Sequence, residues 1–337
     1  MLSKIIVSPA PHVSDKLSTR TIMRDVLIGL MPAVIAAGIF FRFRALLITS
    51  VCVVACMASE WICTRIRKKP NSLGDLSAAV TGLILALSLP PAVPVSAAII
   101  GSVFAVVIAK MLFGGLGSNV FNPAMVGRAF LTATFGVAMT TWTVPAIIDP
   151  DMPKLSPSNP SAITQATPLA WSKMAQKQEV KTEQANLLIK NAFWGNSGGC
   201  LGETSAAALI LGGIYLLIRK TITWHIPAAV LISAGVISLT GWLIKPEQFA
   251  SPLLHLFGGG LLIGAFFIAT DPVTAPLTEK GNLIFGAGVG ILIMLIRYLG
   301  EYPEGVMYAV LIMNALSPLI DRYCRYVPIG GKPHVKA

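Results

Sequence analysis

Two acidic residues of this sequence stand in near-copies of one short motif, where their carboxylates can do chemistry. Residues 73–79 are LGDLSAA and residues 201–207 are LGETSAA, so five of the seven positions are identical and the acidic position is kept as Asp75 and Glu203. Each motif directly precedes an apolar run, whose first backbone N–H groups have no partner within a helix. A carboxylate there can cap the helix, or bind or relay a cation if it lies at membrane depth. The residues alone leave both roles open.

A third acidic residue, Asp271, follows another apolar run. Its segment Thr-Asp-Pro pairs weakly with the Phe-Asn-Pro segment at 121–123. We include Asp271 with Asp75 and Glu203 on a predicted ion path, and a plain interfacial position is the alternative. None of the five cysteines belongs to a C-x-x-C pair, so the sequence predicts no metal site.

The composition indicates which elements must position these carboxylates. Of the 337 residues 54% are hydrophobic and only 12% are charged, against about a quarter charged in soluble proteins, and the mean hydropathy is +0.73. Most residues of such a chain are expected to lie within a membrane. Ten apolar runs fit about ten transmembrane helices in an all-α, polytopic protein. They lie near 26–41, 45–64, 76–90, 93–112, 124–142, 204–218, 224–244, 253–270, 283–299 and 305–320. The run at 76–90, closed by two prolines, is the best candidate for a helix that only half spans the membrane.

The two motifs also predict an internal repeat. Three predicted spans separate them, and because this number is odd the two copies should enter the membrane from opposite sides. This is the pattern of an inverted-topology repeat, which places sites near the midplane where the halves meet. A chance match of a short Ala- and Ser-rich string is the alternative.

The net charge of +11 comes from 26 Lys and Arg residues against 15 Asp and Glu residues. The basic residues stand in short clusters between apolar runs, which favours membrane orientation over nucleic-acid binding. With a cytoplasmic N-terminus, 17 of the 26 fall on the inner side and nine on the outer side: Arg42, Arg44, Lys154, Lys173, Lys177, Lys181, Lys190, Lys245 and Arg297. We therefore expect a cytoplasmic segment at 1–25, a transmembrane domain at 26–320 with an extracytoplasmic loop at 143–203, and a cytoplasmic tail at 321–337.

One stretch of the long loop, SAITQATPLA at 161–170, is by local physics only a hydroxyl-bearing loop. It resembles, however, the Ser/Thr-x-Ala-Thr flavinylation motif, in which a transferase esterifies the last threonine to the phosphate of FMN outside the cytoplasm. Thr167 matches the acceptor and Thr164 the first hydroxyl, with Ala166 and Pro168 beside the acceptor. Ser161 departs from the aspartate that family motifs often carry there.

The resemblance extends along nearly the whole chain. It is carried by SPAPH at 8–12, the Gly-, Asn-Pro- and Gly-Arg-containing segment at 114–131, GNSGG at 195–199, TDPVTAP at 270–276 and NALSPLID at 314–321. These segments are similar to the D subunit of Rnf ion-translocating electron transport complexes and to its paralogue, the B subunit of sodium-pumping NADH:quinone reductases. The paralogue has a longer N-terminal extension than the roughly 25 residues found before the first span here, so we prefer the Rnf family.

The resemblance implies a subunit of a bacterial or archaeal inner-membrane complex that passes electrons between ferredoxin and NAD and moves Na⁺ or H⁺. It implies covalent FMN at Thr167, maturation by a flavin transferase, and a non-covalent riboflavin whose ligands the sequence does not place. Iron-sulfur and NAD sites then belong to partner subunits. Two rivals from other classes stay open: a solute channel or transporter with an inverted repeat, and a scaffold subunit without cofactor. Neither rival would carry covalent flavin.

Overall fold

The computed structural model describes residues 18–70, 72–143, 169, 182–195, 198–246, 249–300 and 304–325. Throughout this described part the regular structure is helical and contains no β-strand, which confirms the predicted all-α class. The α-helices are α1 (Thr19–Ile66), α2 (Ser77–Leu87), α3 (Val95–Val106), α4 (Pro123–Thr134), α5 (Gly136–Thr140), α7 (Thr182–Trp194), α8 (Ala206–Ile218), α9 (His225–Ile244), α10 (Pro252–Phe257), α11 (Leu261–Ile263), α12 (Glu279–Leu299) and α13 (Val306–Tyr323). Two short 3-10 helices, η1 (Leu73–Asp75) and η3 (Leu201–Glu203), and two π-helical segments, η2 (Val107–Met111) and η4 (Gly264–Ile268), complete the set.

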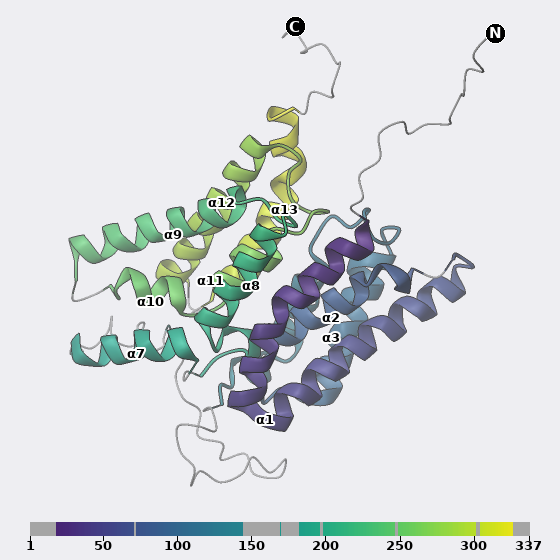
Figure 1. Cartoon of the computed structure of the whole chain (residues 1–337), viewed down its shortest axis with the longest axis horizontal. Helices are drawn as coiled ribbons and strands as arrows, with labels where there is room; N and C mark the ends of the chain where they lie inside the picture. The colour runs from purple at the N-terminus through teal and green to yellow at the C-terminus, as the bar shows by residue number, and fades with distance from the viewer. Residues whose placement is uncertain are drawn as a thin grey trace, which may run out of the picture.

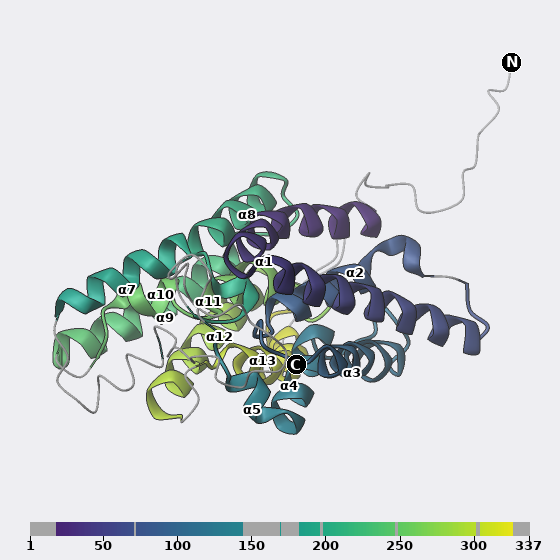
Figure 2. The ribbon, with the colours of Figure 1, turned by 90° about the horizontal axis from the view of Figure 1, so that it is seen from below.

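Helix α1 consists of two arms joined by a sharp bend. Its 48 residues would measure about 70 Å if straight, more than twice the roughly 30 Å hydrocarbon core of a bilayer. At Arg42 the backbone leaves the helical region, with φ 52° and ψ −137°, and the second arm turns back from the first (Figures 1 and 2). The arms cover the predicted runs 26–41 and 45–64, so two separate helices are confirmed in this segment.

Helix α2 is short and enclosed by protein. All 11 of its residues are buried, and it packs against α1, α3 and α4. Eleven residues rise only about 17 Å. A helix of half the membrane thickness is tolerated where protein rather than lipid surrounds it, as predicted for the run at 76–90.

The helices that follow the two repeated motifs run in opposite directions. Glu60, near the end of the second arm of α1, lies beside Ser72 just before η1 and α2. Asp25, near the start of the first arm, pairs with Arg219 just after α8. The second arm is therefore antiparallel to α2 and the first arm is antiparallel to α8. Because the arms also oppose each other, α2 and α8 start from opposite ends of the molecule, as an inverted repeat requires.

The apolar run at 253–270 is not one helix, which corrects the prediction of a continuous span there. It is divided into α10, α11 and the π-helical η4. The break falls at Gly258–Gly260, where Gly258 is extended and Gly259 has a φ of 70°. Glycine adopts such a left-handed conformation without strain, so the backbone can turn here although every neighbouring residue is apolar.

Glycines on α12 allow close contacts with two neighbouring helices. A Cβ at Gly286 would lie 2.8 Å from the Cβ of Ala229 on α9, and one at Gly288 would lie 2.5 Å from the Met313 methyl group on α13. Helix α12 therefore packs tightly against a neighbour on two sides.

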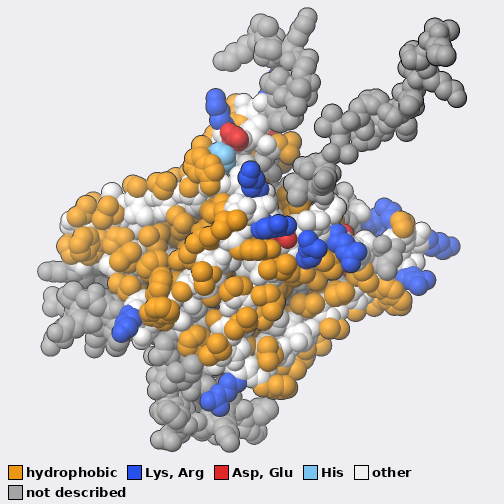
Figure 3. Space-filling model, in the orientation of Figure 1, with side chains coloured by type: hydrophobic (Ala, Val, Ile, Leu, Met, Phe, Trp, Pro, Cys, Tyr) orange, Lys and Arg blue, Asp and Glu red, His pale blue; other side chains and the backbone are white. Residues whose placement is uncertain are grey.

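The outer surface fits a membrane environment. Three described helices, α1, α9 and α12, are long and apolar enough to cross a bilayer. Hydrophobic side chains cover most of the face seen in Figure 3, and the Lys and Arg side chains gather mainly toward one end. The described ends of the chain, at the start of α1 and the end of α13, lie at that same end (Figure 1).

Candidate functional site

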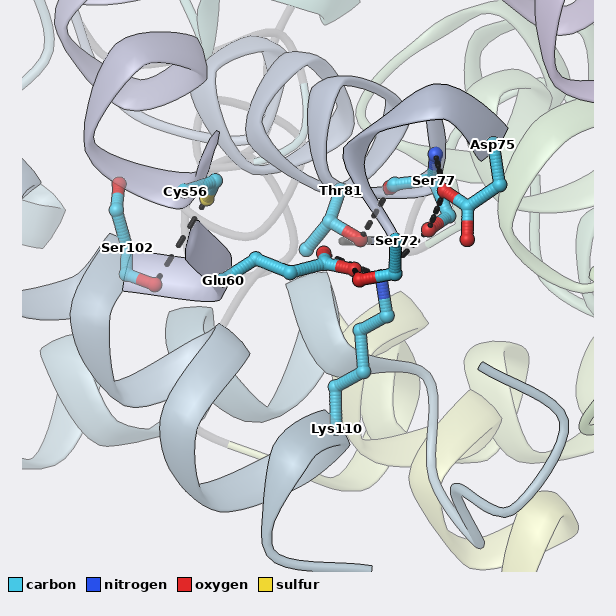
Figure 4. A network of polar contacts seen from close by, with 8 residues as sticks. All are labelled: Cys56, Glu60, Ser72, Asp75, Ser77, Thr81, Ser102 and Lys110. Atoms are coloured by element: carbon cyan, nitrogen blue, oxygen red, sulfur yellow. Dashed lines mark hydrogen bonds and ion pairs between the residues drawn. The ribbon is translucent and has the colours of Figure 1, made fainter. Parts of the chain in front are cut away.

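A network of charged and hydroxyl side chains, of which Glu60, Ser77 and Lys110 are buried, lies between α1, α2 and η2 (Figure 4). We call Glu60, Ser72, Asp75, Ser77 and Lys110 the Lys110 network. The ammonium nitrogen of Lys110 lies 2.6 Å from Oε2 of Glu60 and 2.5 Å from Oγ of Ser77. The Glu60 and Lys110 side chains are both only 1% exposed. An ion pair so fully removed from solvent is costly to build, and it is strongly destabilised when one partner is lost.

Local backbone geometry places the acceptors of this network. Asp75 closes η1, and Leu76 then takes a left-handed conformation with φ 65° before α2 starts at Ser77. One carboxylate oxygen of Asp75 accepts hydrogen bonds from the backbone N–H of Ser77 at 2.8 Å and from its hydroxyl at 2.5 Å. The helix-start role predicted for Asp75 is therefore present. The oxygen of the same hydroxyl accepts a hydrogen bond from Lys110, so the carboxylate is linked to the ammonium through Ser77.

The second arm of α1 completes the Lys110 network. The Ser72 hydroxyl donates to Oε1 of Glu60 at 2.5 Å, while Oε2 of the same carboxylate faces Lys110. Both oxygens of this buried carboxylate are thus hydrogen-bonded, which is the condition under which an ionised group is tolerated in a protein interior.

A cavity of about 60 Å³ adjoins the Lys110 network, and Lys110, Asn119, Asn122 and Asp271 are among the residues that line it. The amide of Asn122 donates to the carbonyl oxygen of Ile268, at the end of η4, at 3.5 Å. The two weakly similar segments at 121–123 and 270–272 therefore meet at one cavity. Asp271 lies on its wall and accepts from the Thr274 hydroxyl at 3.1 Å.

A second charged group, the Arg128 cluster, contains Arg128, Cys200, Glu203 and Glu304. Nη2 of Arg128 lies 2.5 Å from Oε2 of Glu304, 4.0 Å from Oε1 of Glu203 and 3.3 Å from the Cys200 sulfur. One oxygen of each carboxylate is buried without a hydrogen-bond partner among the described residues. The ligand atoms of Cys200, Glu203 and Glu304 lie within 4.8 Å of one another. The guanidinium contacts all three, and its positive charge opposes a metal ion there.

Glu203 does not act as its counterpart Asp75 does. The start of α8 is capped by the Ser205 hydroxyl, which accepts from the N–H of Ala208 at 3.3 Å. The Glu203 carboxylate faces Arg128 instead. The capping alternative therefore holds for Asp75 and is wrong for Glu203.

Helix α4 connects the two charged regions. Asn122 caps its start at the cavity, with its side-chain oxygen accepting from the N–H of Ala124 at 3.1 Å. Arg128 lies six positions further along, which is about 9 Å of helix rise. Asp75 and Asp271 thus lie in the region near Asn122, at the start of α4. Glu203 lies beside Arg128, further along the same helix.

The four residues of the flavinylation motif, Thr164, Ala166, Thr167 and Pro168, lie outside the described residues. The next residue, Leu169, is described and only 2% exposed. A Cβ at Gly259 would lie 2.5 Å from Cδ1 of Leu169 and 2.9 Å from Nη2 of Arg297. Arg297 is buried and donates to the carbonyl oxygens of His255 and Gly258, at 2.5 Å and 3.0 Å. The flank of the motif is therefore packed on the glycine break and beside a buried guanidinium.

The count of basic residues on the two sides includes Lys110 and Arg128 on the inner side and Arg297 on the outer side, but the structure buries all three side chains. Each is buried and bound to carboxylate or carbonyl oxygens, so it does not report the charge of a loop. Without Lys110 and Arg128 the inner side has 15 basic residues instead of 17, and without Arg297 the outer side has 8 instead of nine. The excess of basic residues on the inner side therefore remains. The sequence does contain a signal for the Glu60–Lys110 pair, because both residues fall inside predicted apolar runs. Ionisable residues are rare within such runs and are commonly functional.

Comparison with known proteins identifies the family. The model of the NQR2, RnfD, RnfE family matches residues 6–330. The D subunit of the proton-translocating ferredoxin:NAD(+) oxidoreductase complex of Clostridium ljungdahlii is 40% identical over 97% of this chain and 96% of its own. The D subunit of the ion-translocating oxidoreductase complex of Cronobacter sakazakii is 40% identical over 95% of this chain and 97% of its own. The D subunit of the Na(+)-translocating ferredoxin:NAD(+) oxidoreductase complex of Acetobacterium woodii is 38% identical over 95% of this chain and 94% of its own. With a family match over nearly all its residues, the chain belongs to the NQR2, RnfD, RnfE family.

Proposed function

We propose that this chain is the D subunit of an Rnf-type ion-translocating ferredoxin:NAD oxidoreductase complex. The observation that carries the proposal is the full-length similarity to relatives that are named as this subunit. It favours the Rnf reaction over that of the paralogous sodium-pumping NADH:quinone reductase. Iron-sulfur and NAD sites then lie on partner subunits, and nucleic acid has no role.

Covalent FMN at Thr167 is the cofactor that this proposal requires. FMN supplies one- and two-electron transfer when it is bound, and the protein supplies position and insulation. Leu169 supports the assignment because two residues of extended chain reach at most about 7 Å, which keeps Thr167 close to the packed Leu169 backbone. The described residues there fit a phosphate-linked flavin. Gly258 and Gly259 pack against Leu169, and the Nε of the neighbouring Arg297 is buried without a hydrogen-bond partner among the described residues, which leaves one cationic donor for a phosphate.

The cavity beside Lys110 does not fit a second flavin. Its volume of about 60 Å³ is far below the roughly 300–1,000 Å³ of sites for drug-sized ligands. We therefore assign no ligands to the riboflavin that the family resemblance implies.

Ion movement is assigned to the two charged regions, with Asp75 and Asp271 at one and Glu203 at the other. Buried ionisable groups within a membrane protein commonly mark the route of an ion. The coupled ion is Na⁺ or H⁺, and the relatives' names include both.

The proposal includes an orientation in the inner membrane, surrounded by lipid. Both termini face the cytoplasm, and the loop at 143–203 lies outside, where a flavin transferase can reach it. The remaining 15 to 8 asymmetry of basic residues and the common side of the described chain ends support this orientation.

The proposal is tested in membrane vesicles that contain the complete complex. Ferredoxin-dependent reduction of NAD is expected in the wild type and is expected to be lost in Thr167→Ala, with the complex still assembled. NADH-dependent quinone reduction in the same vesicles, without ferredoxin activity, would instead support the paralogous reductase. Full ferredoxin activity in assembled Thr167→Ala complex would contradict the flavin relay, and absence of in-gel flavin fluorescence would favour the channel alternative.

A further inference from the structure

Two helices of this protein end in the same three residues and in the same backbone geometry. Residues 66–68, at the end of the second arm of α1, and residues 218–220, at the end of α8, are both Ile-Arg-Lys. In each copy the lysine N–H bonds to the carbonyl oxygen three residues earlier, and the next N–H bonds to the one five residues earlier. This is the Schellman pattern of a helix end. Both helices run toward the same end of the molecule, because α2 is antiparallel to the second arm and opposite in direction to α8.

Both lysines stand at a backbone position that favours glycine. Lys68 has a φ of 50° and Lys220 has a φ of 56°, in the left-handed region that glycine adopts without strain. Both residues are exposed. A lysine at each of these positions gives up the easier backbone for a positive charge at the helix end, which points to a use for that charge.

Positive charge is concentrated at the end of α1. Four of the five residues at 65–69 are basic, namely Arg65, Arg67, Lys68 and Lys69. In the described part of the chain none of the four forms an ion pair with a carboxylate. Arg67 donates to the carbonyl oxygen of Met111 at 2.5 Å. Glu60, earlier in the same helix, is bound to Lys110 and Ser72 instead. The end of α1 is therefore a group of positive charges without a carboxylate partner among the described residues.

The end of α8 has the same backbone but a lower charge. Nε of Arg219 lies 3.3 Å from Oδ2 of Asp25, so this arginine is paired. Thr221 stands where the end of α1 has Lys69, and its hydroxyl also donates to Asp25, at 3.3 Å. Only Lys220 is left there without a carboxylate partner among the described residues. The two helix ends thus form a natural comparison, in which the charge differs and the backbone does not.

Large apolar side chains lie among the charges at the end of α1. Trp61 is 45% exposed, Ile66 is 75% exposed and Leu112 is 71% exposed. The Arg65 guanidinium lies over the Trp61 ring, 5.5 Å from its centre. The bond from Arg67 to the residue before Leu112 brings the latter beside this helix end. Figure 3 shows Lys and Arg side chains next to hydrophobic ones at the end of the second arm. We call Trp61, Arg65, Ile66, Lys68, Lys69 and Leu112 the Lys68 surface.

This combination fits the headgroup region of a membrane. Lys and Arg residues next to a membrane-crossing helix attract anionic lipids. Tryptophan and the aliphatic stems of long basic side chains suit the boundary between headgroups and acyl chains. A soluble acidic partner would match the charges only. Ile66 and Leu112 instead continue the apolar outer surface of α1, on which Ile62 is exposed one turn earlier. The observations therefore favour a lipid over a soluble protein.

We propose that the Lys68 surface binds one anionic phospholipid through its phosphate headgroup. Lys68 and Lys69 donate hydrogen bonds to the phosphate oxygens, Arg65 is held in place over Trp61, and the acyl chains lie along the apolar members of the surface. The leaflet rests on the proposed function, because the orientation proposed there makes it the cytoplasmic one. The contact with the lipid does not depend on that orientation.

The first test measures contact between lipid and Trp61 in the full-length chain, reconstituted in phosphatidylcholine vesicles. Brominated phosphatidylglycerol or brominated phosphatidylcholine is added at equal mole fraction, and the fluorescence that is lost in Trp61→Phe is assigned to Trp61. Bromine quenches a tryptophan that it contacts. The brominated phosphatidylglycerol should quench this part of the fluorescence more strongly, with a binding constant several-fold above that of phosphatidylcholine. Equal quenching by the two lipids overturns the proposal.

A pair of triple variants separates the site from general surface charge. Arg65→Gln, Lys68→Gln and Lys69→Gln together should remove the preference for phosphatidylglycerol. The matched control replaces Arg20, Arg24 and Lys280, three exposed basic residues at the same end of the molecule, by Gln. It lowers the net charge by the same amount and should keep the wild-type preference. An unchanged preference in the first triple variant, or an equal loss in both, overturns the proposal.

The second test counts the lipid on the complete complex by native mass spectrometry with added phosphatidylglycerol. The first triple variant should retain fewer phosphatidylglycerol molecules than the wild type. Lys220→Gln, at the end of α8, should match the wild type, because that end carries less unpaired charge. Equal numbers in the wild type and the first triple variant would show that another subunit covers the Lys68 surface in the complex, which overturns the proposal.

The covalent flavin is measured in the same preparations of the complex. Normal flavin without any preference for phosphatidylglycerol rejects the lipid site alone. A preference for phosphatidylglycerol without covalent flavin rejects the flavin relay and leaves the lipid site supported.

Discussion

At the scale of residues, the Lys110 network and the Arg128 cluster are each held together by charged side chains that lie far apart along the chain. Asp75 could be found because it precedes an apolar run in a repeated motif, and the structure shows it at the start of α2. The Glu60–Lys110 pair joins residues fifty positions apart. Each partner alone is a single charge within an apolar run, and only the packing of η2 against α1 brings the two together. The same applies to Arg128 and Glu304.

The Glu60–Lys110 pair leads to a stability prediction. Glu60→Gln leaves a buried ammonium without its counter-charge and should lower the free energy of unfolding by about 3–5 kcal/mol. Adding Lys110→Met should restore most of this loss, because a neutral pair no longer needs compensation. Denaturant unfolding in detergent measures both effects, with the exposed Lys245→Gln as control. A double variant as unstable as the single one would contradict the account.

Asp75 allows its structural and electrostatic roles to be separated. Asp75→Asn keeps an acceptor oxygen for the N–H of Ser77, so stability should change by less than about 0.5 kcal/mol, whereas Asp75→Ala should cost about 0.5–2 kcal/mol. Ion-coupled turnover should fall in both variants, because both remove the charge. Unfolding and ion-transport assays on the same preparations check this. Full coupled turnover in Asp75→Asn would show that the residue is only a cap.

At the scale of elements, hydrophobic runs give the helices and glycines decide how they end and pack. Each predicted apolar run contains helix, and the two copies of the repeated motif lie at the starts of α2 and α8, which run in opposite directions. The run at 253–270 was predicted as one span because its hydropathy is continuous, but the backbone at Gly259 divides it. Hydropathy does not report this, since the division depends on backbone angles and on the packing of Leu169 and Arg297 around the glycine.

The contact between α1 and α8 gives a prediction at this scale. A Cβ at Gly212 would collide with the carbonyl oxygen of Gly29, whereas a Cβ at Gly235 on α9 meets no atom within 4 Å. Gly212→Ala should therefore destabilise the protein by about 1–3 kcal/mol through overpacking. Gly235→Ala should be neutral or slightly stabilising, because alanine favours helix over glycine. Unfolding of the two variants side by side measures the difference, and equal stabilities would show that α1 and α8 are not in close contact.

At the scale of the whole molecule, charge distribution predicts orientation. Once the buried basic residues are set aside, the asymmetry still favours the proposed cytoplasmic position of both chain ends. The proposed covalent flavin belongs to the same scale, because its acceptor loop would have to be outside for modification while the flank of the motif packs on the helical domain at Leu169. The sequence predicts an acceptor threonine but not the place where the flank of its motif packs, because Leu169 meets Gly259, which lies ninety positions further along the chain.

Two exposed lysines report the orientation. Lys220 follows α8 and Lys245 follows α9, so they lie at opposite ends of two consecutive helices. In intact cells a membrane-impermeant thiol reagent should label Lys245→Cys, and it should label Lys220→Cys only after permeabilisation. The wild type, with its native cysteines, gives the background. The reverse pattern would invert the topology and place the loop at 143–203 in the cytoplasm.

The central claim is that this subunit carries its redox cofactor on Thr167. The most direct measurement is mass spectrometry of the peptide spanning 164–173 from the assembled, active complex, produced together with a flavin transferase. The account predicts one FMN phosphoester on Thr167, retained in Thr164→Ala and absent in Thr167→Ala. An unmodified Thr167 in a fully active wild-type complex would contradict it.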